Sequence, residues 1–132
     1  GPHENYCDRK IGAYLGVYRF KSAEDFIHDY LYPQENGNRC DVRWLEVGSD
    51  VKLRVDAVGR AFEAGVHPYT LEELDAAKHS CDLPRHDYLT VNIDGGQQGV
   101  GGDVPAVATL KPQYKLPKMQ TLTLRCTLQF KK

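Results

Sequence analysis

The last part of the chain alternates strictly between apolar and polar residues. From Thr121 to Phe130, leucine, cysteine or phenylalanine occupies every second position, and threonine, arginine or glutamine occupies the positions between. Successive side chains of a β-strand point to opposite faces, so the pattern predicts a half-buried strand over residues 121–130. Cys126 falls on the apolar face of this strand, which predicts that its thiol is buried.

Shorter segments of the same kind come earlier in the chain. Asp41–Val47 and Val51–Val58 are predicted to form a hairpin, because the turn residues Gly48-Ser49-Asp50 separate them. Trp44 shares a face with Val42 in the first of these strands, and a place in the core is its expected role. Four further strands are predicted, at Ala13–Arg19, Ala61–Val66, Tyr88–Ile93 and Tyr114–Leu116.

Two short helices are predicted between the strands. Ser22 can cap a helix over Ala23–Tyr30, and Thr70 with Glu73 forms a T-x-x-E capping box before Leu74. Proline and glycine interrupt the remaining sequence at short intervals, which is typical of turns. Many short strands with frequent turns and little helix predict an all-β protein, built as an antiparallel sandwich or barrel.

Length and charge narrow the class of protein. The chain has 132 residues, which fits a single domain. Its 17 Lys and Arg balance 18 Asp and Glu, so no net field attracts nucleic acid or an anionic membrane. The longest apolar or glycine run, Ile11 to Tyr18, is far shorter than the ~20 residues of a membrane span. We therefore expect neither nucleic acid nor a membrane as a partner. The first residue is not Met, and we expect an excised piece of a longer protein.

Residues suited to catalysis or metal binding are present without a recognisable motif. The four cysteines form no C-x-x-C pair and the five histidines have no ligand spacing, so no metal or cofactor is expected. All four cysteines are expected to be small buried side chains. Asp94–Asp103 holds five glycines and must be a loop, but it lacks the Lys-Ser/Thr of a phosphate-binding loop. Taken alone, the residues indicate no catalytic group.

A series of motifs nevertheless runs along the whole chain. It opens with G-P-H-E-N-Y-C-D-R at residues 1–9 and continues with P-Q-E-N-G-N at 33–38 and D-V-R-W at 41–44. P-Y-T-L-E-E-L at 68–74 and Q-Q-G-V-G-G-D at 97–103 complete it. In this order the motifs resemble the C-terminal, or small-chain, domain of bacterial β-galactosidases of glycoside hydrolase family 2.

The resemblance implies a fold and a parent enzyme. The fold is an antiparallel β-supersandwich like that of galactose mutarotase, with residues 1–132 as the C-terminal portion of the small-chain domain. The parent is a retaining β-galactosidase, a bacterial homo-oligomer in the cytoplasm or periplasm, whose catalytic barrel and paired glutamates are absent from this chain. Retaining hydrolysis needs both carboxylates, so the chain alone is expected to be inactive. Its expected partners are the barrel, the other domains and a β-galactoside at the cleft.

The same resemblance assigns the glycine-rich loop to the rim of the substrate cleft. The rim residues are Gly99, Gly101, Gly102, Asp103 and Ala106, with Asp103 as the organiser of the loop. In the family this loop usually continues with S-W, and the tryptophan stacks on substrate; here V-P-A follows, and Ala106 takes its place. The missing indole removes a stacking surface worth of order 1 kcal/mol, so the glycoside can differ from that of the family.

Two other functions stay open at this stage. A stand-alone carbohydrate-binding module would present an exposed aromatic surface to a sugar. A mutarotase-like isomerase would need an acid and a base in one cleft, and the sequence offers no matching pair of histidine and glutamate. The polar motif residues Glu4, Asn5, Glu35 and Asn36 are expected to be structural and to satisfy backbone groups in turns.

Overall fold

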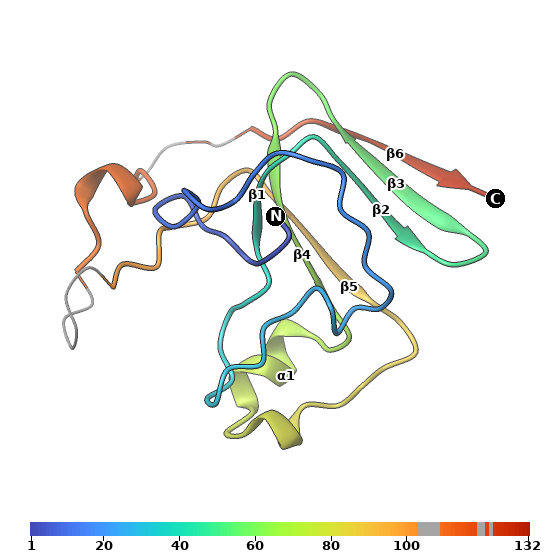
Figure 1. The fold of residues 1–132 in the computed structure, drawn as a ribbon, viewed down its shortest axis with the longest axis horizontal. Coiled ribbons are helices and arrows are strands. Elements are labelled where there is room, and N and C mark those ends of the chain that lie inside the picture. The colour runs from blue at the N-terminus through green and yellow to red at the C-terminus, as the bar shows by residue number, and fades with distance from the viewer. Residues whose placement is uncertain (103–108, 119–120, 122) are drawn as a thin grey trace.

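Two three-stranded antiparallel sheets make up most of the regular structure (Figure 1). One has the order β1-β4-β5, with β1 at Arg39–Val42, β4 at Phe62–His67 and β5 at Thr90–Asp94. The other has the order β2-β3-β6, with β2 at Trp44–Gly48, β3 at Lys52–Ala57 and β6 at Cys126–Lys131. The computed structural model describes residues 1–102, 109–118, 121 and 123–132. The predicted all-β class is confirmed, and the supersandwich stays a prediction.

The core lies where β3 of one sheet meets β4 of the other. Val55, Phe62 and Ala64 form its centre and are almost completely buried. Side chains from both sheets and from the segment before β6 pack around them: Val42, Leu45, Leu53, Ala57, Ile93 and Leu124. Burial of these apolar side chains holds the sheets together, because each removes surface from water.

The predicted strand Asp41–Val47 is in fact two strands. β1 ends at Val42 and β2 begins at Trp44, in the other sheet, so the chain turns a corner at Arg43. Asp41 has a φ of 58°, and the pairing of β1 with β4 shifts register there. The corner breaks the alternation, so Leu45 rather than Trp44 joins Val42 at the core.

The predicted core role of Trp44 is therefore wrong. Its side chain is 39% exposed, and the Arg54 guanidinium lies over the ring, 4.2 Å from its centroid. Trp44 thus lies on the polar face of its sheet, where Arg54 also pairs with Asp56 and Glu46. The hairpin of β2 and β3 is confirmed, with Leu45 opposite Val55 and Gly48 opposite Lys52.

The last strand is shorter and more exposed than its alternation indicates. β6 begins at Cys126 and pairs with β3, with Val55 opposite Leu128 and Leu53 opposite Phe130. Leu128 is 59% exposed and Phe130 80% exposed. The prediction that Cys126 is buried is wrong, because β6 is an edge strand. Alternation shows which residues share a face of the strand, but not whether other parts of the protein cover that face. Cys81 is also exposed, and Cys7 and Cys40 are half-buried.

One of the two predicted helices forms. α1 spans Leu71–Ala76, and the predicted capping box is present: the Glu73 N–H donates to Thr70 Oγ1 and the Thr70 N–H to Glu73 Oε2. The helix predicted over Ala23–Tyr30 is wrong. Only a single turn forms there, because the His28 N–H donates to Asn36 Oδ1 instead of continuing a helical ladder.

The described ranges also contain two three-residue 3₁₀ helices, η1 at Ser80–Asp82 and η2 at Pro112–Tyr114. The strands predicted at Ala13–Arg19 and Tyr114–Leu116 do not form, and the first of these segments is an irregular, mostly exposed stretch. The strands predicted at Ala61–Val66 and Tyr88–Ile93 correspond to β4 and β5. No helix in the described ranges has the length and apolar character to cross a membrane.

Candidate functional site

The glycine-rich loop leaves the end of β5, as the sequence predicts. Its described rim residues are Gly99, Gly101 and Gly102; Asp103 and Ala106 lie outside the described residues. Gly101 has a φ of 72° and Gly102 a φ of 92°, the left-handed region that residues with a Cβ rarely adopt. Glycine is therefore required here by the backbone path itself.

The side chain that holds this loop comes from the opposite end of the sequence. Asp8 Oδ1 accepts a hydrogen bond from the Val100 N–H at 3.1 Å, and Asp8 Oδ2 accepts one from the Gly101 N–H at 2.8 Å. One carboxylate thus binds two consecutive backbone amides, and such charge-assisted bonds are stronger than neutral ones. Figure 1 shows the N-terminal segment in blue close to the orange segment that follows β5.

Gly99 is fitted closely to this carboxylate. A Cβ at this position would lie 2.5 Å from Asp8 Oδ2 and 2.7 Å from Leu110 Cδ1. The Gly99 N–H donates to the Tyr114 carbonyl at 3.0 Å, so η2 holds the loop from its other side. The neighbouring Cys7 thiol lies 3.7 Å from the Gln97 carbonyl. Burial raises the pKa of Cys7, and the Asp8 charge raises it further, which keeps the thiol neutral.

The sequence pattern does not identify the role of Asp8, although it contains a signal. It belongs to the opening motif, and the loop belongs to the last motif of the same series. Nothing in the spacing along the chain shows that these two motifs meet. The role of organiser was predicted for Asp103, and among the described residues that role belongs to Asp8.

The polar residues of the motifs mostly serve the backbone, as predicted. Glu4 Oε2 accepts from the Gly37 N–H at 2.9 Å, and its other oxygen accepts a short hydrogen bond from the Tyr30 hydroxyl. Asn5 Oδ1 accepts from the Cys40 N–H at 2.9 Å, and the Asn5 N–H donates to the Asn38 carbonyl at 2.8 Å. These bonds fix the opening segment against β1.

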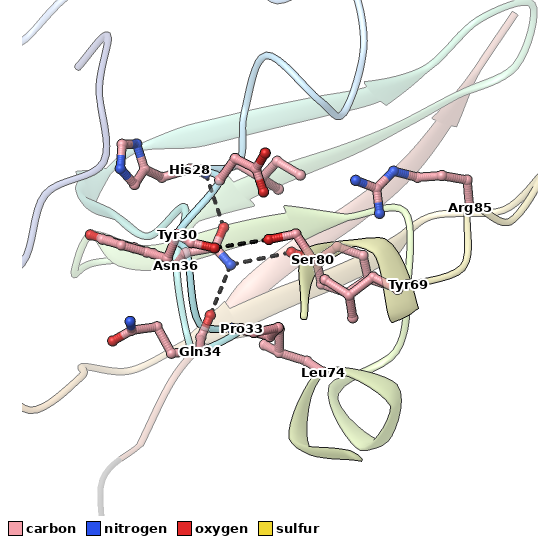
Figure 2. A pocket seen from close by; sticks show the side chains of 12 residues that line it. His28, Tyr30, Pro33, Gln34, Asn36, Tyr69, Leu74, Ser80 and Arg85 are labelled. Atoms are coloured by element: carbon pink, nitrogen blue, oxygen red, sulfur yellow. Dashed lines mark hydrogen bonds between the residues drawn. The ribbon is translucent and has the colours of Figure 1, made fainter. Parts of the chain in front are cut away.

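Asn36 has the same structural role in the small cavity of Figure 2. Its amide nitrogen donates to the Gln34 carbonyl and to the Tyr69 hydroxyl, while its oxygen accepts from the His28 N–H. The cavity volume of about 10 Å³ holds no more than about one water molecule. It is too small for a sugar, and several of its lining residues are hydrogen-bonded to one another.

Two pairs of histidine and glutamate are close enough to interact. His67 is completely buried, and its Nε2 lies 3.0 Å from the Asn36 carbonyl, which can only accept, so Nε2 carries the proton. Burial raises the pKa of the nearby Glu35, and the charge of His67 opposes the rise. No substrate in solvent reaches His67, so the pair gives an isomerase no cleft.

The second pair supports the capping of α1. His86 Nε2 lies 2.9 and 3.0 Å from the two Glu73 oxygens, and its ring stacks on Tyr88. The Thr70 N–H and His86 hold the pKa of Glu73 below its usual range. Within the described ranges, no three His, Cys, Asp or Glu side chains converge to hold a metal ion.

Comparison with known proteins places the whole of this arrangement in one family. The family model described as the β-galactosidase small chain matches residues 1–128. A β-galactosidase of Halalkalibacterium halodurans is 40% identical over 92% of this chain, and one of Priestia megaterium is 39% identical over 98%. β-Galactosidase BgaC of Bifidobacterium adolescentis is 36% identical over 98%. In all three the chain spans 12% of the relative's length. The chain belongs to the β-galactosidase small-chain family.

Proposed function

We propose that this chain is the non-catalytic small-chain part of a retaining β-galactosidase and that its glycine loop forms part of the rim of the substrate cleft. The observation that carries the proposal is the loop itself, since Asp8 and Tyr114 hold its backbone in a defined position while Val100 stays 48% exposed. A fixed, glycine-rich backbone lets a ligand approach closely, which suits a contact at the edge of a binding site.

The catalytic groups belong to the rest of the parent enzyme in this proposal. The relatives are named β-galactosidases and are about eight times as long as the matched segment, which spans 12% of each. The double displacement needs two carboxylates about 5 Å apart on either side of the glycosidic bond. The role left to this chain is to shape the cleft and to pack against the catalytic barrel.

The surface for that packing is the exposed apolar segment between residues 11 and 18. Ile11 is 99% exposed, and Tyr14, Leu15 and Val17 are each more than 60% exposed. The segment has an ordered backbone, because the Tyr18 hydroxyl donates to the Tyr14 carbonyl and the Ala13 N–H to the Lys10 carbonyl. Contiguous apolar surface of this kind is typical of an interface.

The test uses the full-length enzyme that carries this chain and a pair of matched valines. Val100 in the loop and Val58 after β3 are both 48% exposed. Val100→Trp is expected to raise KM for a chromogenic β-galactoside roughly fivefold or more by crowding the rim. Val58→Trp adds the same bulk after β3, outside the loop, and is expected to leave KM unchanged. Equal effects of the two substitutions would refute the rim role.

A second measurement separates this proposal from a stand-alone sugar-binding module. Amide NMR spectra of the 132-residue chain are recorded during titration with galactose and lactose. We expect no saturable shifts, because the cleft exists only in the whole enzyme. Shifts that saturate and cluster on residues 99–102 would instead show that the chain binds sugar by itself. Turnover of a chromogenic galactoside by the repurified chain would refute the non-catalytic role.

A further inference from the structure

We propose that Asp8 is a positioning residue of the β-galactosidase, which sets the place of the rim loop and thereby the affinity for substrate. The inference rests on the proposed function, because it gives Asp8 a role only if the loop meets the substrate. Asp8 itself touches no reacting group in this proposal. It acts through the backbone of Val100 and Gly101, the two residues whose amides it binds.

The position of the loop depends on the Asp8 carboxylate. Two consecutive amides, 92 and 93 positions along the chain from Asp8, share its two oxygens. The missing side chain of Gly99 makes room for the carboxylate, since a Cβ there would lie 2.5 Å from Asp8 Oδ2. Loop and carboxylate are therefore complementary in both hydrogen bonding and shape.

Asp8 itself is held in a fixed position. The Arg9 N–H donates to the Tyr6 carbonyl at 2.8 Å, and the Tyr6 N–H to the Arg9 carbonyl at 3.4 Å, so residues 6–9 form a tight turn. The Tyr6 side chain is buried, and the Asn5 backbone is bonded to Asn38 just before β1. Asp8 therefore holds the loop in a fixed position relative to the sheet that contains β1.

The contact between Asp8 and the loop adjoins the apolar segment, residues 11–18, that we assign to packing on the barrel. Ile11 follows Asp8 by three residues and borders the same surface hollow. The turn that presents Asp8 therefore links the packing surface to the rim. A rim loop held in this way is placed relative to the barrel, and a displacement of its backbone weakens substrate binding without altering the catalytic carboxylates.

The experiment compares three variants of the full-length enzyme. Asp8→Ala removes both acceptors, and Asp8→Asn keeps one acceptor oxygen. The control is Asp41→Asn, which breaks the exposed ion pair between Asp41 and Lys10, whose charged atoms lie 2.7 Å apart. Lys10 follows Asp8 by two residues, so the control changes a charge close to the same turn. Asparagine tolerates the left-handed backbone of Asp41, so this variant is expected to fold normally. Steady-state kinetics give KM and kcat, and hydrogen exchange with mass spectrometry follows the loop amides.

We expect Asp8→Ala to raise KM roughly tenfold with kcat within about twofold, because a displaced rim loop loses binding that substrate and transition state share. Asp8→Asn is expected to lie between Asp8→Ala and wild type, and Asp41→Asn to match wild type. Exchange at residues 99–101 is expected to rise in Asp8→Ala, while exchange in β4 and β5 stays as in wild type.

The other outcomes separate the inference from the proposed function. Unchanged exchange at 99–101 in Asp8→Ala would overturn the inference, and Val100→Trp can then still show the loop at the rim. Faster exchange with unchanged KM would overturn both, because the loop would move without affecting substrate. If Asp8→Ala lowers kcat, raises KM and lowers Tm together, Asp8 has a merely structural role. This result would also overturn the inference.

Discussion

Substitutions in β6 test whether the uncovered apolar face of this strand drives self-association of the isolated chain. Phe130 is 80% exposed and Leu128 59% exposed, and β6 is the edge of its sheet. Full burial of such side chains contributes about 1.5–3 kcal/mol each, so covering what remains exposed contributes about 3 kcal/mol per chain. A symmetric pair gains about twice that amount, and pairing of the strand edges adds about 1 kcal/mol for each hydrogen bond.

Association itself opposes this gain by about 4 kcal/mol or more. With two such hydrogen bonds the net gain is about 4 kcal/mol, which corresponds to a Kd near the millimolar range. We expect light scattering to show monomers at micromolar protein and dimers or larger species at millimolar protein. Phe130→Ser is expected to abolish this concentration dependence. Gln129→Ser changes the opposite face of the same strand and serves as the control, which should associate like wild type.

Two results would refute the reasoning. A wild-type chain that stays monomeric at millimolar concentration would show that the exposed face is too small to associate. Association that persists unchanged in Phe130→Ser would show that the backbone edge of the strand, and not its apolar face, is responsible.

Three further substitutions test other contacts. Gly99→Ala forces a Cβ against Asp8 and should lower the free energy of unfolding, measured in urea, by about 1–3 kcal/mol. The same substitution should cost less in an Asp8→Ala background, and equal costs in the two backgrounds would contradict the contact. Arg39 is buried against Phe26 and donates to three backbone carbonyls, so Arg39→Lys should lower the free energy of unfolding by about 2–4 kcal/mol. Arg125 is exposed, and Arg125→Lys should leave this free energy unchanged in the same titration. The Thr70 N–H and His86 lower the pKa of Glu73, so the Glu73 carboxylate stabilises the fold above pH 4.5 and this contribution is lost as pH falls through the lowered pKa. Glu73→Gln should therefore flatten the acid limb of a plot of Tm against pH, and an unchanged limb would argue against these two contacts of Glu73.

Local patterns predicted the elements that depend on nearby residues. The alternation in β3 and the turn between β2 and β3 need only short-range information, and both formed close to their predicted positions. β6 lies within the predicted alternating segment but begins only at Cys126. The capping box of α1 is likewise contained in four residues. The helix predicted over Ala23–Tyr30 failed because a side chain several residues later, Asn36, takes the amide of His28.

Predictions that depend on tertiary context failed or were incomplete. Trp44 was assigned to the core because the corner at Arg43 leaves no mark in the alternation. Cys126 was expected to be buried because a pattern shows a face and not what covers it. The contact of Asp8 with the glycine loop joins residues more than ninety positions apart, and no periodicity in the sequence spans that distance.

The corner at Arg43 has a mechanical consequence for the whole molecule. A single residue joins strands of different sheets there, and the Arg43 carbonyl is tied to the Ala57 N–H of β3 at 2.9 Å. The joint is too short to let one sheet slide over the other, so a force applied to β6 is passed through β3 to β1 and on to the strands beside it. Extra residues inserted at this joint would decouple the sheets, whereas the same residues inserted at the tip of the β2–β3 hairpin would leave them joined.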